Sequence, residues 1–207
     1  MPESSTTSRV RKSPHERRAE VEAAARAIAL EQGLDALTLR AVASRVGVAP
    51  GLVAHYAGTM DDLVAETFGE LVSAELREVL QLMRAVDAPT ARMRVLLDTL
   101  LDGSRADITL VWVQAWALGA RGEALAARVR TEMDAWQAAI AAEIERGMDA
   151  GEFARADAAA IAWHVLAMID GQGAYSLVRW NDQPDRRALT ARAVAGLLGA
   201  APEALGG

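Results

Sequence analysis

Two short helical patterns joined at one glycine constrain the fold of this 207-residue chain more than any other feature. They lie in the stretch TLRAVASRVGVAPGLVAHY, residues 38–56. The first has apolar residues at helical spacing and ends at Gly47, which can adopt the left-handed conformation of a sharp turn. The second opens at Pro50, because the first turn of a helix does not need that N–H. Helices of about eight residues are marginal alone, so packing must hold the pair, and a helix-turn-helix is predicted.

Helical patterns account for the rest of the chain, so an all-α fold is predicted. Hydrophobic residues make up 52 % of the sequence, enough for a sizeable core, and no run keeps the alternation of a half-buried strand. Ser13, Pro14 and Glu16 have the spacing of a helix start with a capping box, and Thr38 and Thr59 can cap later helices. About nine helices are expected; they span 14–32, 39–46, 50–55, 60–83, 89–102, 107–118, 123–150, 157–180 and 185–198.

Charge divides the chain into unlike parts. Residues 1–60 carry 8 Lys/Arg and 6 Asp/Glu, a net charge of +2, whereas residues 61–207 carry 14 and 22, a net charge of −8. This asymmetry is typical of a small basic region that binds nucleic acid and is attached to a larger acidic domain. We therefore divide the chain into a disordered basic arm (1–12), a head (13–59), a body (60–200) and a flexible tail (201–207). Five basic residues gather near the start: Arg9, Arg11, Lys12, Arg17 and Arg18.

Composition also excludes several classes of protein. The chain has no cysteine, and its three histidines lie far apart, so neither a metal site nor a cofactor is expected. No Ser-His-Asp order, phosphate-cradling glycine loop or recognisable acid pair occurs, and an enzyme is not predicted. No apolar run is long enough to span a bilayer, and no signal peptide is recognisable. A cytoplasmic protein without a membrane partner is the expectation.

The head resembles a known family of regulators. The stretch LTLRAVASRVGVAPGLVAHYAGTMDDLV, residues 37–64, is similar to the DNA-binding head of the TetR family of bacterial repressors. Three segments of the body, RVLLDTLL, LVWVQAWALG and AMIDGQGAY, are similar to the branch of that family that includes the repressor of choline-to-betaine genes. The head positions that match the family pattern are Thr38, Val42, Ala43, Gly47, Val48, Gly51, His55 and Tyr56.

The resemblance implies a homodimeric, ligand-responsive transcriptional repressor. Two heads would bind a pseudo-palindromic operator in double-stranded DNA, and a small-molecule effector in the body would release it. For several candidates a structural reading stays open: Tyr56 could fill core, His55 could be packed or capping, and Arg40 and Arg45 could be solvated surface. The expected DNA-binding residues are Thr38, Arg40, Arg45, Ala49, Pro50, Gly51, Leu52, His55 and Tyr56.

The head also departs from the family pattern. Ala49 stands where a capping serine is usual, Ala54 replaces an aromatic or hydroxyl residue, and Met60 replaces a lysine that would reach phosphate. Ala57 replaces a usual phenylalanine. Affinity would then depend on the arginines, the arm and backbone N–H groups. The alternative is a TetR-like regulator whose weakened head acts through a protein partner.

The body offers candidates for an effector site. Trp112 and Trp116 share a helix face, and stacked aromatics can hold an organic cation through cation–π attraction. The other reading is that tryptophans on an apolar face fill core, that His164 is a satisfied core histidine, and that Asp170 bonds a protein partner. The predicted ligand-binding residues are Trp112, Trp116, Met133, Trp136 and His164, with Gln114 and Gln172 as weaker candidates.

Two glycines in one predicted helix indicate a close helix crossing. Gly171 and Gly173 cost roughly 1 kcal/mol each relative to alanine, and a dimer seam would offset that cost. A four-helix bundle across a two-fold axis is expected, which would place two recognition helices about 34–36 Å apart. The predicted seam residues are Leu166, Ile169, Gly173 and Leu177 on one helix and Leu189, Ala193 and Leu197 on the next.

Overall fold

The computed structural model describes residues 13–180 and 186–206, and within these ranges it contains nine α-helices and no strand. The all-α prediction is confirmed. The predicted basic arm, residues 1–12, lies outside the described residues. The helices are α1 (Pro14–Gln32), α2 (Leu39–Val46), α3 (Pro50–Ala57), α4 (Met60–Arg84), α5 (Pro89–Leu101), α6 (Ala106–Gly119), α7 (Glu123–Asp149), α8 (Ala158–Leu177) and α9 (Arg186–Leu198); a 3-10 turn, η1 (Leu34–Ala36), follows α1.

Local signals fix where the helices of the head begin. The Ser13 hydroxyl accepts from the Glu16 N–H at 3.2 Å, and the Glu16 carboxylate accepts from the Ser13 N–H at 2.7 Å. Thr38 caps α2 through the Ala41 N–H at 3.1 Å, and Thr59 caps α4 through the Asp62 N–H at 3.0 Å. Such caps satisfy N–H groups that have no partner inside the helix. The predicted capping box and both threonine caps are confirmed.

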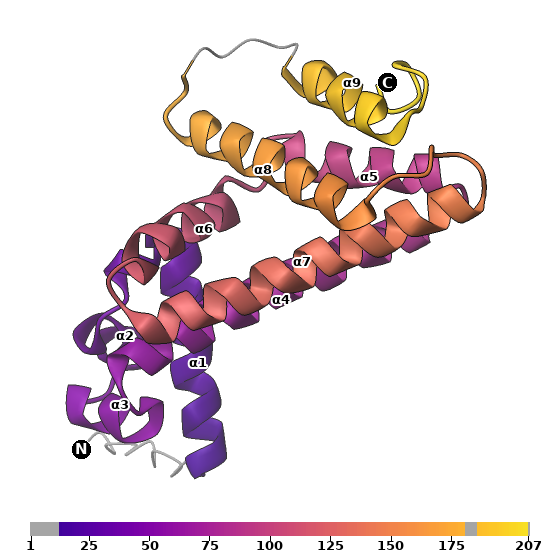
Figure 1. The fold of residues 1–207 in the computed structure, drawn as a ribbon. Coiled ribbons are helices and arrows are strands. Elements are labelled where there is room, and N and C mark those ends of the chain that lie inside the picture. The colour runs from indigo at the N-terminus through magenta and orange to yellow at the C-terminus, as the bar shows by residue number, and fades with distance from the viewer. Residues whose placement is uncertain (1–12, 181–185, 207) are drawn as a thin grey trace, which may run out of the picture.

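The head occupies one end of the molecule, and α4 and α7 run side by side away from it (Figure 1). Helix α6 lies between the head and the remaining helices, while α5, α8 and α9 gather at the far end. Buried Glu132 of α7 accepts from the Ser73 hydroxyl of α4 at 2.9 and 3.0 Å, which ties the two long helices together. The buried side chains form one continuous hydrophobic core that extends from the head into the body.

The C-terminal end differs from the expected flexible tail. Leu205 is 1 % exposed and belongs to the hydrophobic core. Burying a leucine contributes about 1.5–3 kcal/mol, so Leu205 holds this segment against the body, while residues 201–203 are exposed. Across the described ranges, no helix has the length and apolar character needed to cross a membrane.

Candidate functional site

The helix-turn-helix presents a small, mostly exposed surface. Gly47 ends α2 in the left-handed conformation, with φ of 74°, and Ala49 precedes α3 with extended backbone and no side-chain cap. Val53 is fully buried and holds α3 against the head. Eight of the nine predicted DNA-binding residues are exposed, and the other is half-buried: exposed are Thr38, Arg40, Arg45, Ala49, Pro50, Gly51, Leu52 and His55, and half-buried is Tyr56.

The two predicted arginines of α2 have different surroundings. Arg45 donates to both carboxylate oxygens of Glu31 on α1, at 2.7 and 2.5 Å, and this arginine lowers the pKa of Glu31. Arg40 makes no ion pair with any described residue, and it borders the open cleft between head and body. Of the two, Arg40 is therefore the arginine whose charge is not already matched by a described carboxylate.

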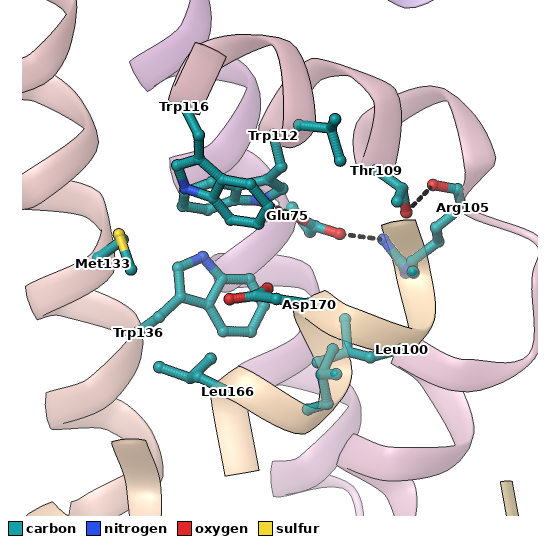
Figure 2. A pocket seen from close by; sticks show the side chains of 13 residues that line it. Glu75, Leu100, Arg105, Thr109, Trp112, Trp116, Met133, Trp136, Leu166 and Asp170 are labelled. Carbon is teal, nitrogen blue, oxygen red and sulfur yellow. Dashed lines mark hydrogen bonds and ion pairs between the residues drawn. The ribbon is translucent and has the colours of Figure 1, made fainter. Parts of the chain in front are cut away.

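An enclosed pocket lies in the body, bounded mainly by α4, α6, α7 and α8 (Figure 2). The cavity volume is about 60 Å³, which is room for a few waters or one compact organic molecule. The lining residues are Glu75, Leu100, Arg105, Thr109, Trp112, Val113, Trp116, Met133, Trp136, Leu166, Ile169, Asp170 and Gly173.

Three indoles form the aromatic part of the wall. The ring centroids of Trp112 and Trp116 lie 5.8 Å apart, and Phe68 meets Trp112 edge-on at 5.1 Å. Trp136 comes from α7 and is 4 % exposed. The indole N–H groups of Trp116 and Trp136 are buried without an acceptor among the described residues. The wall of the pocket thus includes two indole N–H groups that have no acceptor among the described residues.

Two acids lie in the same pocket. Burial raises the pKa of Glu75 to about 7, opposed by the Trp112 N–H at 3.2 Å and the Arg105 guanidinium at 3.8 Å. Burial alone raises the pKa of Asp170 to about 7, and no described residue donates a hydrogen bond to its carboxyl. Figure 2 shows both carboxyls among the indoles. Asp170 is therefore an acceptor without a partner, which differs from the expectation that it bonds a protein group.

The structure brings together most, but not all, of the predicted ligand residues. Trp112, Trp116, Met133 and Trp136 all line the pocket. His164 does not, since it is exposed on the outer side of α8 and its Nδ1 contacts the Ala160 carbonyl oxygen at 2.8 Å. Sequence reasoning missed the polar lining residues, because their helix faces are set by packing between distant segments: Glu75, Arg105, Thr109 and Asp170.

The predicted seam on α8 is largely turned inward. Leu166, Ile169 and Gly173 line the pocket, and a Cβ on Gly173 would meet the Thr109 methyl of α6 at 3.0 Å. Gly173 thus permits a close approach between α8 and α6 within one chain. Leu177 is half-buried, whereas the predicted α9 residues Leu189, Ala193 and Leu197 are exposed. The large exposed hydrophobics of this end are Trp163, Tyr175, Val178, Trp180, Leu189 and Leu197.

Gln114 connects the pocket helix with the head. Its Oε1 accepts from the Leu34 N–H at 2.5 Å and the Asp35 N–H at 3.4 Å, and its Nε2 donates to the Asp35 carboxylate at 2.9 Å. Gly33 makes room for this amide, because a Cβ there would collide with the Gln114 side chain. The glutamine is therefore not a pocket residue but a contact between α6 and the 3-10 turn η1 of the head.

A helix-turn-helix head on a helical body with an enclosed pocket defines a class of ligand-sensing transcription regulators. Residues 22–67 match the family model for the tetR family of bacterial regulatory proteins, and residues 89–199 match the model for the C-terminal part of BetI-type transcriptional repressors. The chain belongs to the TetR family and has a body of the BetI type. It is a transcriptional regulator, not an enzyme.

Individual relatives agree with this assignment. The HTH-type transcriptional regulator BetI of Burkholderia mallei is 29 % identical over 145 residues, covering 68 % of this chain and 71 % of the relative. Among solved structures, a TetR transcription regulator from Haloarcula marismortui has a TM-score of 0.74 at 22 % identity, covering 89 % of this chain and 97 % of that one. A regulator from Saccharomonospora viridis, solved in complex with choline, has a TM-score of 0.74 at 19 % identity and covers 89 % and 96 %.

Proposed function

We propose that the protein is a dimeric repressor that binds a pseudo-palindromic operator and releases it when a small-molecule effector enters the body. One observation carries the proposal. Helix α6 supplies Trp112 and Trp116 to the pocket wall and, between them, Gln114 to the contact with the head. A ligand that moves the tryptophan face therefore moves the group that holds Leu34 and Asp35.

Release requires that the effector bind one head arrangement better than another, since a ligand shifts an equilibrium only by its differential affinity. In our proposal the empty pocket corresponds to the DNA-binding arrangement. The pocket is small, so in our proposal an occupant larger than its volume displaces α6, α7 or α8. The pocket's lining and the head contact share a helix of 14 residues, so a displacement of one end reaches the other.

Dimerisation is proposed through the exposed face of α8 and α9. Trp163 on α8 and Leu189 on α9 are each 57 % exposed. Large apolar side chains gathered on one face mark an interaction surface. A two-fold dimer through this face would leave both heads free at the opposite end, because the head of one chain lies far from α9 (Figure 1). The operator's half-sites would then be about one helical turn apart.

The test is a fluorescence-anisotropy titration of the protein on labelled DNA flanking its own gene, at two salt concentrations. We expect sequence-selective binding that weakens with salt, because phosphate contacts release counterions. Arg40→Gln should lower the salt slope by roughly one. Arg130→Gln is the matched control, because Arg130 lies on α7 and pairs with Glu123 at 2.6 Å.

A second candidate function keeps one supporting observation: Ala49 caps α3 without a side-chain hydrogen bond, and Ala54 and Met60 offer phosphate no polar group. A regulator with this weakened head would act through a protein partner. Absence of DNA binding even at low salt would favour it over the repressor. Salt-sensitive, selective binding would count against it.

A further inference from the structure

A second cavity lies at the end of the body opposite the head, where α5, α8 and α9 gather (Figure 1). Its volume is about 230 Å³, which is room for a phosphate group and a few further heavy atoms. The wall combines the turn between α5 and α6, the last turns of α8 and the start of α9. Among the described residues, its charged lining consists of four arginines and one aspartate: Arg105, Arg179, Arg186, Arg187 and Asp102.

Two of these arginines are already matched by carboxylates. Arg105 pairs with Glu78 at 2.8 Å, and Arg187 pairs with Asp98 at 2.6 Å. Hydrogen bonds within its own turn, and then the charges of the same two arginines, lower the pKa of Asp102. The aspartate of the lining is therefore associated with the paired arginines.

The other two arginines, Arg179 and Arg186, have no carboxylate partner among the described residues. The Arg186 guanidinium donates to the Trp180 carbonyl oxygen at 2.6 Å and lies 5.0 Å from the centre of its indole ring. No side-chain hydrogen bond or ion pair joins Arg179 to this part of the chain. The cavity thus has an excess of positive charge, located where α8 ends and α9 begins.

The backbone at Arg179 has a conformation that glycine adopts more easily. Its φ is 52°, and within the described ranges it is the only residue other than glycine with a positive φ. The Arg179 N–H donates to the Ser176 carbonyl oxygen at 3.0 Å, and the Trp180 N–H donates to that of Tyr175 at 3.1 Å. This pairing is typical of a helix end that has glycine at the left-handed position. A larger residue there costs free energy, and such departures from local rules are expected at functional positions.

We propose that this cavity binds a small phosphorylated molecule, with the phosphate group held by Arg179 and Arg186. Guanidinium groups bind phosphate oxygens through paired, charge-assisted hydrogen bonds. The rest of the volume takes the atoms that carry the phosphate. Free phosphate and a phosphate ester share this chemistry, and the probes below separate them. DNA bound by the head does not reach the cavity, because the two lie at opposite ends of the molecule (Figure 1).

The site is distinct from the indole pocket, although Arg105 and three other residues line both cavities. The indole pocket contains the carboxyls of Glu75 and Asp170 and no arginine besides Arg105. Two acids there disfavour an anion, whereas the outer cavity favours one. The regulator would then have a second ligand, which is independent of the effector.

Isothermal titration calorimetry on the full-length protein without DNA, at constant ionic strength, tests the proposal. The probes are glycerol 3-phosphate, inorganic phosphate and glycerol, which lacks the phosphate group. We expect at least one of the two phosphates to bind at one site per chain, about tenfold or more tightly than glycerol. The phosphate that binds more tightly identifies whether the ligand is free phosphate or an ester.

Two substitutions assign the site. Arg179→Gly and Arg186→Gln should each weaken phosphate binding about tenfold or more. Without ligand, Arg179→Gly should melt at no lower temperature than the parent, because glycine relieves the left-handed backbone. Its loss of binding then does not come from unfolding. Arg130→Gln is the matched control and should bind as the parent does, because Arg130 pairs with Glu123 on α7 outside the cavity.

Trp136→Phe distinguishes the two cavities, since it removes an N–H donor of the indole pocket alone. Phosphate affinity should be unchanged in this variant, whose fold is checked by a thermal melt. Weaker binding there, with Arg179→Gly unaffected, would assign the anion to the indole pocket and overturn the inference. Equal affinity for glycerol and both phosphates, or binding that persists after both arginine substitutions, would overturn it as well.

Discussion

At the scale of single residues, Asp170 has the most unusual environment in the body. Its pKa of about 7 compares with an ordinary 3.8, and burial is the cause. The folded chain therefore holds its proton up to neutral pH, while the unfolded chain loses it near pH 4. The charged groups that share the pocket are Glu75 from α4 and Arg105 before α6; α5 and α7 contribute no charged lining residue. The contribution of Asp170 to stability without ligand then falls as pH rises from 4 to 7, and the penalty remains complete above 7.

Asp170→Asn removes this penalty. At pH 8 we expect the variant to have a free energy of unfolding about 1–3 kcal/mol higher than the parent. The difference should shrink steadily as the pH falls from 7 towards 4, where the parent's carboxyl is neutral in both states. Urea unfolding at pH 8, 6 and 4.5 measures it. Asp134→Asn on the exposed side of α7 is the control; a gain that is the same at every pH would contradict the assignment.

Residues whose role depends on nearby sequence were predictable, and those that depend on packing were not. Ser13, Thr38 and Thr59 cap helices through neighbours three residues on, a signal contained in the sequence itself. Asp170 and His164 lie six residues apart on one helix, yet one faces the pocket and the other faces out. Helical spacing puts the two residues on different faces, roughly 240° apart, but which face meets the pocket depends on how α8 packs against α6. That packing includes the close approach of Gly173 to Thr109, which belong to different helices.

At the scale of elements, the contact between α6 and η1 depends on one side chain. Gln114→Met keeps the volume and removes all three hydrogen bonds to Leu34 and Asp35. We expect amide exchange in residues 33–36 to become roughly 5–10 times faster, because each lost bond costs about 1 kcal/mol. Hydrogen exchange with mass spectrometry on the ligand-free protein measures this.

The control for that experiment is Gln137→Met, since Gln137 donates to the Ala159 carbonyl oxygen and joins α7 to α8 far from the head. It should leave exchange in residues 33–36 unchanged. Unaltered protection in Gln114→Met would mean that apolar packing, not the amide, holds the head against α6.

Helix positions followed closely from the sequence. The expected first two helices, 14–32 and 39–46, coincide with α1 and α2, and α3 extends two residues beyond the predicted 50–55. The 3-10 turn η1 was not predicted, because two of its three residues, Leu34 and Asp35, are held from outside by Gln114, about 80 positions away. Helical periodicity is a local property, whereas this turn depends on a contact between distant segments.

At the scale of the whole molecule, the exposed α8–α9 face is the expected dimer surface. Leu189→Glu places a charge there, and burying an unpaired charge is costly. The parent should have twice the 22.0 kDa of one chain by light scattering, the variant should be a monomer, and its DNA affinity should fall by at least about 100-fold because two half-sites no longer bind together. Leu82→Glu on the exposed side of α4 is the control and should remain dimeric.

The seam could be predicted only in part for a geometric reason. Leucines at helical spacing on α8 and α9 indicate two apolar faces, but a helix buried on one side and paired on the other has two such faces. Ile169 belongs to the inner face and is 8 % exposed, while Trp163 belongs to the outer one. The sequence pattern does not say which face would meet a second copy; because the pocket occupies the inner face, we propose the outer one.

Helix α6 also separates two properties of the molecule, ligand contact and contact with the head, on two of its faces. Trp112 and Trp116 face the pocket, and Gln114, roughly 200° further around the helix than Trp112, faces the head. Substitutions on the tryptophan side can therefore alter which molecule is recognised without touching the link to DNA. Such a layout allows a lineage to acquire a response to a new compound in single steps, and it gives a protein engineer a biosensor whose input can be rewritten while its output stays fixed.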